Sequence, residues 1–293
     1  MKHSYSGITL LGENGKEACM KSLSRLVTAG ISVTTALFLG SPAAASPASA
    51  ATIYHRPVVV VGANQSNNWS GYNQGTLEQG GRSFHQISGT WVVPTASAHK
   101  PGENEYSATW VGIGGGCVDA GCMLTDTTLI QAGTSQDVGS NGQATYTAWW
   151  EIIPAPSVPV SLAVTAGNTV SVNIAETTPQ VWSITINNVS TGQSWSTTVP
   201  YSSTYATAEW IEETPVVLDS SGAVTVGPLP RLSQVTFDAG TVNGGNPGLR
   251  SSEEMQLVDT NGAALATPSS PDPDTDGFND CAYASTCAAP ASS

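Results

Sequence analysis

The chain has 293 residues, 40% of them hydrophobic, which is enough for one large domain with a sizeable core. Only 11% of the residues are charged and the formal net charge is −13, so the surface must be covered mainly by uncharged polar side chains. This acidic excess repels nucleic acid and anionic lipid, and neither is expected as a partner. The charge alone fits an ordinary acidic secreted protein as well as a protein adapted to acid.

The N-terminal part of the sequence is typical of a targeting segment. Lys21 and Arg25 precede an apolar run over residues 26–39, and cleavage options of the A-x-A type end at Ala45 and Ala50. The apolar run is too short and too rich in Ser and Thr for a membrane span. We therefore predict a secreted protein.

The leader sets the expected domain limits. Residues 1–50 are predicted to be the signal or leader segment, with Met20 as an alternative start. Residues 51–66 form a short N-terminal extension, and residues 67–293 form a single domain, because no linker divides them.

Four cysteines remain after the leader, in two close pairs. In an exported chain, local disulfides between Cys117 and Cys122 and between Cys281 and Cys287 are the natural interpretation. A zinc site is the alternative, but no histidine lies near either pair.

Most of the domain is predicted to be β-strands. Val170, Val172 and Ile174 alternate with polar residues, and the same period of two continues along the chain. The predicted strands cover residues 87–93, 106–113, 145–153, 170–174, 182–187, 194–199, 207–213, 231–237 and 254–258. Many short strands separated by turn residues predict an all-β antiparallel sandwich, with a loose C-terminal region from Thr267.

Elimination narrows the possible chemistry. The sequence has no H-E-x-x-H zinc motif, no G-x-S-x-G elbow and no Asp-Thr-Gly or Asp-Ser-Gly triplet. Four cysteines in two pairs leave no free thiol for a nucleophile. The remaining candidates for catalytic groups are carboxylates and amides in aromatic surroundings.

Six sequence words occur in the order found in the glutamic peptidases, or eqolisins, which the chain resembles over residues 64–260. The words are Asn68-Trp69-Ser70-Gly71-Tyr72, Gly89-Thr90-Trp91-Val92-Val93-Pro94, Thr109-Trp110-Val111-Gly112-Ile113-Gly114, Leu129-Ile130-Gln131-Ala132-Gly133, Tyr146-Thr147-Ala148-Trp149-Trp150-Glu151 and Ala208-Glu209-Trp210-Ile211-Glu212-Glu213. The resemblance implies a sandwich of two antiparallel sheets, of the concanavalin A-like or jelly-roll type. It also implies a secreted endopeptidase that acts on peptides in acid, with no metal or cofactor. We expect the protein to be a monomer.

The resemblance assigns the catalytic roles to Gln131 and Glu213, and it places Trp110, Trp149 and Glu151 in the substrate cleft. A glutamate can take a proton from water and return it to the leaving amine. A neutral glutamine amide can donate to the developing oxyanion. We expect Gln131 and Glu213 on neighbouring strands of one sheet, close enough to share a water molecule.

Several alternatives stay open at this stage. Gln131 could be a surface residue or a cross-strand hydrogen-bonding residue, and Glu213 could end a strand in solvent. Alternation puts Glu209 and Glu213 on the same face, so only the resemblance chooses between them. Where fungal members carry an aspartate after Trp-Val-Gly-Ile, this chain has Gly114, and Ser135 replaces a second aspartate.

Two other functions and one other ligand are possible. Glu151 and Glu213 could be the carboxylate pair of a retaining glycoside hydrolase, or the aromatic face could belong to a carbohydrate-binding module without catalysis. Asp272, Asp274 and Asp276 resemble the start of a calcium loop, but Tyr283 stands where such a loop has its bidentate glutamate.

Overall fold

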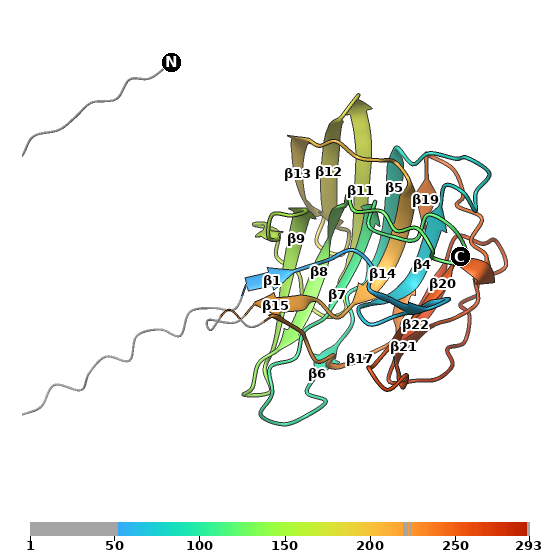
Figure 1. Ribbon diagram of the computed structural model, residues 1–293. Helices are drawn as coiled ribbons and strands as arrows, with labels where there is room; N and C mark the ends of the chain where they lie inside the picture. Colours follow the sequence, from blue (N-terminus) through green and yellow to red (C-terminus); the bar gives the residue numbers. More distant parts are fainter. Residues whose placement is uncertain (1–51, 219–221, 223, 292–293) are drawn as a thin grey trace, which may run out of the picture. The chain divides into compact units, whose positions relative to one another are not determined.

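The structure is a computed structural model that describes residues 52–218, 222 and 224–291. The predicted leader therefore lies outside the described residues. Nearly all regular structure in the described part of the chain is β, with one 3₁₀ turn at Ser251–Glu253. None of the described residues form a helix long and apolar enough to cross a membrane. The predicted all-β sandwich is confirmed, and its strands pack as two large layers (Figure 1).

The first layer is an antiparallel sheet that carries the predicted site. Its strands, in spatial order, are β10 (Val158–Pro159), β9 (Ala144–Ile152), β8 (Ile130–Val138), β7 (Ala108–Ile113), β14 (Thr207–Glu213), β4 (Trp69–Gly75) and β20 (Glu254–Val258). Strand β20 also pairs with strands of the second layer, so the two sheets are joined at that edge.

The second layer contains the longest alternating strands. Its members are β13 (Gln193–Pro200), β12 (Val181–Asn188), β11 (Thr169–Thr178), β5 (Gln86–Val92), β18 (Val235–Phe237), β19 (Thr241–Val242), β22 (Phe278–Ala282), β21 (Ala264–Pro268), β3 (Gln65–Ser66) and β2 (Val60–Gly62). All its ladders are antiparallel except the short β3–β20 pair.

Two small sheets complete the fold. One contains β1 (Thr52–Tyr54), β15 (Val216–Leu218) and β16 (Val224–Val226), and the other contains β6 (Ala96–Ser97) and β17 (Arg231–Leu232). The predicted strand at 231–237 is thus wrong as one element, because Arg231–Leu232 pairs with β6 while Val235–Phe237 joins the second layer.

The region after Thr267 is more ordered than the sequence suggested. Strand β22 (Phe278–Ala282) pairs with both β21 and β18, and Phe278 is fully buried. The loose C-terminal region was therefore a wrong expectation. Its many Pro and Asp residues form a turn, and the strand after it completes the second layer.

The main core lies between the two sheets, and a smaller apolar cluster lies on the opposite face of the first sheet. Side chains such as Val111 and Val172 meet in the main core. Because strand residues alternate between faces, Trp110 points the other way and packs with Trp69 and Trp149 in the smaller cluster. The predicted site belongs to this outer face.

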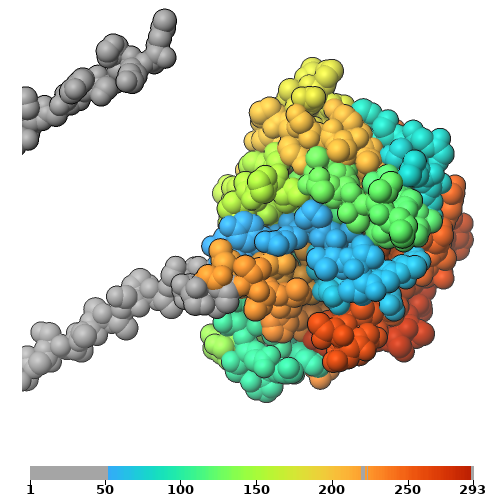
Figure 2. Space-filling view, in the orientation of Figure 1, coloured from blue at the N-terminus to red at the C-terminus, as the bar shows by residue number. Residues whose placement is uncertain are grey.

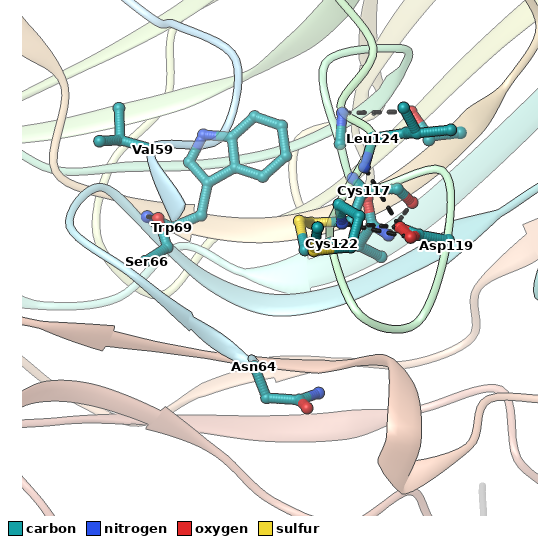
Figure 3. Close-up of a disulfide and its surroundings, with 12 residues drawn as sticks. Val59, Asn64, Ser66, Trp69, Cys117, Asp119, Cys122 and Leu124 are labelled. Atoms are coloured by element: carbon teal, nitrogen blue, oxygen red, sulfur yellow. Dashed lines mark hydrogen bonds between the residues drawn. A yellow bond between two sulfur atoms is a disulfide. The ribbon is translucent and has the colours of Figure 1, made fainter. Parts of the chain in front are cut away.

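Both predicted disulfides are confirmed, Cys117–Cys122 and Cys281–Cys287. Figure 3 shows the first one within a tight loop, where the Asp119 carboxylate accepts the backbone N–H of Met123 at 2.8 Å. Cys117 is buried in the same apolar cluster as Trp69. This bridge therefore holds its loop against the face that carries the site.

Candidate active site

Strand β7 lies between the two predicted catalytic residues. Gln131 on β8 is opposite Gly112 of β7, and Glu213 at the end of β14 is opposite Ala108 of β7. The expectation of neighbouring strands was therefore wrong, since one strand separates them. Their side chains nevertheless share a face, because residues opposite each other in a ladder point the same way.

Trp110 connects the two residues across β7. Its indole N–H donates to Glu213 Oε2 at 2.9 Å. A Cβ added at Gly112 would lie 2.9 Å from the far edge of the Trp110 ring and 3.2 Å from Gln131 Cβ, so the ring extends over Gly112 toward Gln131. The Trp110 side chain therefore reaches from Glu213 toward Gln131 across β7.

Glu151 lies opposite Gln131 on the next strand, β9. The Gln131 Nε2 donates to Glu151 Oε2 at 3.2 Å. Burial, together with the nearby charge of Glu213, raises the pKa of Glu151 to about 9, although the hydrogen bonds that it accepts oppose this shift. Glu151 is therefore protonated and uncharged at acidic and neutral pH.

Gln131, Glu151 and Glu213 are all fully buried, with 0% of each exposed. The alternatives of a surface glutamine and a solvated strand end are thus wrong. The cover comes from the N-terminal segment around His55, which the sequence did not identify as part of the site.

The backbone and side chain of His55 both contact the site. Its carbonyl oxygen accepts Gln131 Nε2 at 3.1 Å, its N–H donates to Glu151 Oε2 at 3.2 Å, and its Nδ1 lies 2.9 Å from Glu213 Oε2. The imidazole stacks on Trp149, with the ring centroids 3.7 Å apart. A histidine in an extension before the domain carries no sequence signal for such a role.

The next residue, Arg56, also contacts the site. Its backbone N–H donates to Glu213 Oε1 at 3.3 Å. Beside this segment lies a cavity of about 450 Å³, lined by Tyr54 and Pro57 from the segment and by Glu151 and Val216 from the strands around it. The structure thus brings all five predicted residues together around the His55–Arg56 segment.

The structure also separates Glu213 from the other two acids of its sequence word. Glu209 is fully buried near Gly116, and an added Cβ at Gly116 would lie 2.6 Å from Glu209 Oε1. Glu212 points to the opposite face, where it accepts Thr109 Oγ1 at 2.6 Å. Burial raises the pKa of both carboxyls well above the ordinary value. Among these three acids, contact with Trp110 and His55 is shown only for Glu213.

The acidic cluster near the C-terminus differs from the loop that was considered as a possible calcium site. Oxygens of Asp238, Asp272 and Asp276 lie within 4.8 Å of one another, and Asp238 comes from beyond β18 rather than from the loop. Asp274, which the sequence pattern included, is not in this group.

Comparison with known proteins gives a family match and two similar sequences. Residues 67–276 match the sequence profile of the peptidase A4 family. Aspergillopepsin-2 of Aspergillus niger is 25% identical over 227 residues, which cover 70% of this chain and 74% of that protein. Scytalidopepsin B of Scytalidium lignicola is 30% identical over 114 residues, or 39% of this chain and 38% of that protein.

Solved structures agree on the fold. A crystal structure of scytalido-glutamic peptidase with a peptide-based transition-state analogue matches with a TM-score of 0.58 at 23% identity. The match covers 74% of this chain and 98% of that one. At this identity the likeness supports the sandwich architecture.

Proposed function

The chain belongs to the peptidase A4 family, the glutamic peptidases or eqolisins, and we propose from this that it is an acid endopeptidase in which Glu213 and Gln131 activate water. Glu213 takes a proton from the water and returns it to the leaving amine. Gln131 donates its amide N–H to the oxyanion. The substrates are peptides and proteins, and no covalent intermediate forms.

One observation carries this proposal: a peptide bond of the chain itself lies between the two side chains. The carbonyl oxygen of His55 accepts Gln131 Nε2, and the following amide nitrogen, that of Arg56, donates to Glu213. A peptidase needs a donor at the carbonyl oxygen and an acid at the departing nitrogen. Gln131 meets the first requirement, and Glu213, which accepts the amide N–H in this arrangement, lies beside the nitrogen that it would protonate.

The surrounding residues have supporting roles in this mechanism. The Trp110 indole holds the Glu213 carboxylate, and Trp149 offers a flat platform for a substrate side chain. Because burial keeps Glu151 protonated, it does not compete with Glu213 for the water proton. We assign Glu151 to substrate binding, where it accepts a backbone N–H.

The same arrangement disfavours the two carbohydrate alternatives. The site holds a peptide backbone, and Gln131, which has no role in a retaining glycosidase, contacts both that backbone and Glu151. Two disulfides fit an oxidising compartment, so we propose that the protein is secreted. We also propose that it is a monomer and that residues 1–50 are its leader. It needs no membrane or nucleic-acid partner.

Hydrolysis of a denatured protein in acid tests the roles directly. We expect Glu213→Gln to abolish turnover, by about 10³-fold or more, because it keeps the shape and removes the proton acceptor. Gln131→Glu should also fail, since it removes the neutral donor. Glu151→Gln should change KM or the pH profile more than kcat.

Glu209→Gln is the matched control, because Glu209 lies on the same strand and is equally buried. The hydrogen bond from Trp110 and the contact with His55 are made by Glu213. If Glu209→Gln abolished turnover while Glu213→Gln retained it, the assignment would be wrong. A metal chelator should leave the activity unchanged, because no step uses an ion.

A further inference from the structure

Three carboxylates meet beside the last strand of the second layer. Asp238 comes directly after β18, and Asp272 and Asp276 lie in the turn before β22. One oxygen atom from each carboxylate lies within 4.8 Å of those of the other two. Because β18 and β22 pair directly, this three-carboxylate group joins two segments that are far apart in the sequence.

The surroundings of Asp272 point to a missing ligand. Only 2% of this residue is exposed. Its Oδ1 accepts the backbone N–H of Asp276 at 3.1 Å and that of Gly277 at 3.2 Å, whereas its Oδ2 has no hydrogen-bond partner among the described residues. A buried carboxylate oxygen loses its hydration at a large cost, so such atoms are normally paired or coordinate a metal ion.

The unpartnered oxygen of Asp272 is directed toward the rest of the group. A Cβ added at Gly277 would lie 2.7 Å from Asp272 Oδ2 and 3.2 Å from Asp238 Cβ, so both side chains border the same small space. Asp276 Oδ1 is also buried and has no hydrogen-bond partner in the part of the chain that the structure describes. Two unpartnered oxygens thus belong to the three-carboxylate group.

The like charges of the group also repel one another. Burial, and then the charges of Asp274, Asp272 and Asp238, raise the pKa of Asp276. A divalent cation between the carboxylates would offset both the burial cost and the repulsion, because it would be the largest local charge.

We propose that Asp238, Asp272 and Asp276 form a structural calcium site. Ca²⁺ takes oxygen ligands at about 2.3–2.6 Å in a flexible geometry, so two ligands of one ion can lie up to about 5 Å apart. The separations in this group fall within that limit. Mg²⁺ holds its ligands at about 2.0–2.1 Å and demands a nearly octahedral geometry, so it fits less well. Water molecules supply the remaining ligands.

The ion holds the turn before β22 against the end of β18. One backbone contact already joins these segments, since the Gly240 N–H donates to Asp276 O at 2.8 Å. Strand β22 pairs with both β18 and β21. A calcium ion here therefore stabilises the closure of the second layer.

The calcium site is separate from the proposed peptidase site, which lies on the outer face of the first layer. Figure 2 shows the N-terminal residues as a blue band across that face, with the C-terminal residues in red at an edge of the molecule. The ion therefore takes no part in hydrolysis, and the proposal goes beyond the proposed function.

Calorimetric titration of the full chain with CaCl₂, after removal of metal ions with EDTA, tests the proposal. The titration is made at about pH 7, because carboxylate ligands must be deprotonated to bind the ion. We expect one ion per chain, with a Kd of about 10⁻⁴–10⁻³ M, as in extracellular calcium modules. The absence of saturable binding would overturn the proposal.

Thermal unfolding at the same pH measures the stabilisation. Ca²⁺ at about 100 times its Kd should raise Tm by about 5–10 °C, because it binds only the folded chain. NaCl at the same ionic strength controls for screening of the acidic surface, and an equal rise in Tm with NaCl would contradict a specific site. Mg²⁺ should give a smaller rise, and an equal rise would overturn the assignment to Ca²⁺.

Substitutions locate the ion. Asp276→Asn keeps the shape of the side chain and removes one charged ligand, so the Kd for Ca²⁺ should rise by about tenfold or more. Asp272→Asn should have the same effect. Because Asp272 also accepts two backbone N–H groups, its variant is first checked for folding by circular dichroism.

Asp274→Asn is the matched control, since Asp274 lies in the same turn and carries the same charge but is outside the three-carboxylate group. Its Kd should change by about threefold or less. If Asp274→Asn weakened binding as much as Asp276→Asn, the general charge of the turn would explain the binding, and the proposed site would be wrong.

Activity separates this proposal from the proposed function. Asp276→Asn should hydrolyse a denatured protein in acid at the wild-type rate while it no longer gains stability from Ca²⁺ at neutral pH. A folded Asp276→Asn chain without activity would overturn the separation of the two sites. A wild-type chain that hydrolyses protein but does not bind Ca²⁺ would overturn the calcium site and leave the peptidase assignment in place.

Discussion

At the scale of single residues, Trp110 connects the two halves of the proposed site. Its indole N–H is the donor that holds Glu213, while its ring reaches toward Gln131 over Gly112. Without that donor the carboxylate loses one of the contacts that fix its position. Positioning of this kind is a large part of enzyme catalysis.

Trp110→Phe should lower kcat by about 10- to 100-fold, because a hydrogen bond to a charged group is worth about 1.5–3 kcal/mol. Trp69→Phe is the matched control. Trp69 packs edge-on against Trp110, but its own indole nitrogen has no partner in the described structure. Steady-state kinetics of both variants on one peptide substrate would check this. Equal losses in kcat would mean that packing, rather than the donor, matters.

The sequence predicted the residues of the site that belong to recognisable words, but it did not predict His55. Gln131 and Glu213 stand in strands that carry other polar residues as well, so only the sequence words single them out. His55 lies in a short extension, and its role depends on tertiary contacts with Glu213, Gln131 and Trp149. No local pattern of residues encodes such contacts.

At the scale of elements, glycines in the central strands make room for the tryptophan. Gly133 of β8 lies opposite Trp110 of β7, and a Cβ there would lie 2.2 Å from Thr109 O and 2.5 Å from Trp110 Cβ. Backbone atoms cannot move aside cheaply at such distances. Gly133 is therefore required for the packing of Trp110 at the site.

Gly133→Ala should destabilise the protein by about 3 kcal/mol and lower activity, because Trp110 must shift. Gly142→Ala is the control. Gly142 has a φ of +78° in an open turn with no atom within 4 Å of an added Cβ, so only backbone strain of about 1 kcal/mol is expected. Urea denaturation of both variants would check this, and equal losses of stability would contradict the packing argument.

The elements that the sequence predicted well are those with long alternation. The predicted ranges 170–174 and 182–187 lie inside β11 and β12, and 207–213 coincides with β14. The predicted strand at 231–237 failed because its two ends pair in different sheets, and sheet membership is set by distant partners.

The conformation of Gly114 could not be predicted from the sequence either. Its φ of +93° and an added Cβ only 2.1 Å from Thr128 O leave no room for a side chain at this position.

At the scale of the whole molecule, buried carboxyl groups make folding depend on pH. Burial raises the pKa of both Asp137 and Asp280 to about 7, and it raises those of Glu209 and Glu212 well above the ordinary value. In the unfolded chain such groups titrate near about pH 4. Between these values the folded state binds more protons than the unfolded state, so stability falls as pH rises. The contribution of these buried groups to stability is therefore fully present below about pH 4.

Asp280→Asn should therefore flatten the decline of stability between about pH 4 and pH 7. The difference in unfolding free energy across that window should shrink by about 2 to 4 kcal/mol, because Asp280 is 1% exposed and its neutral form resembles the amide. Thermal unfolding at several pH values would measure this. Asp259→Asn is the control, since backbone N–H groups lower the pKa of this exposed carboxyl and give it the opposite sign. If the wild-type Tm rose from acid toward neutral pH, the buried carboxyl groups would not govern the pH dependence of folding.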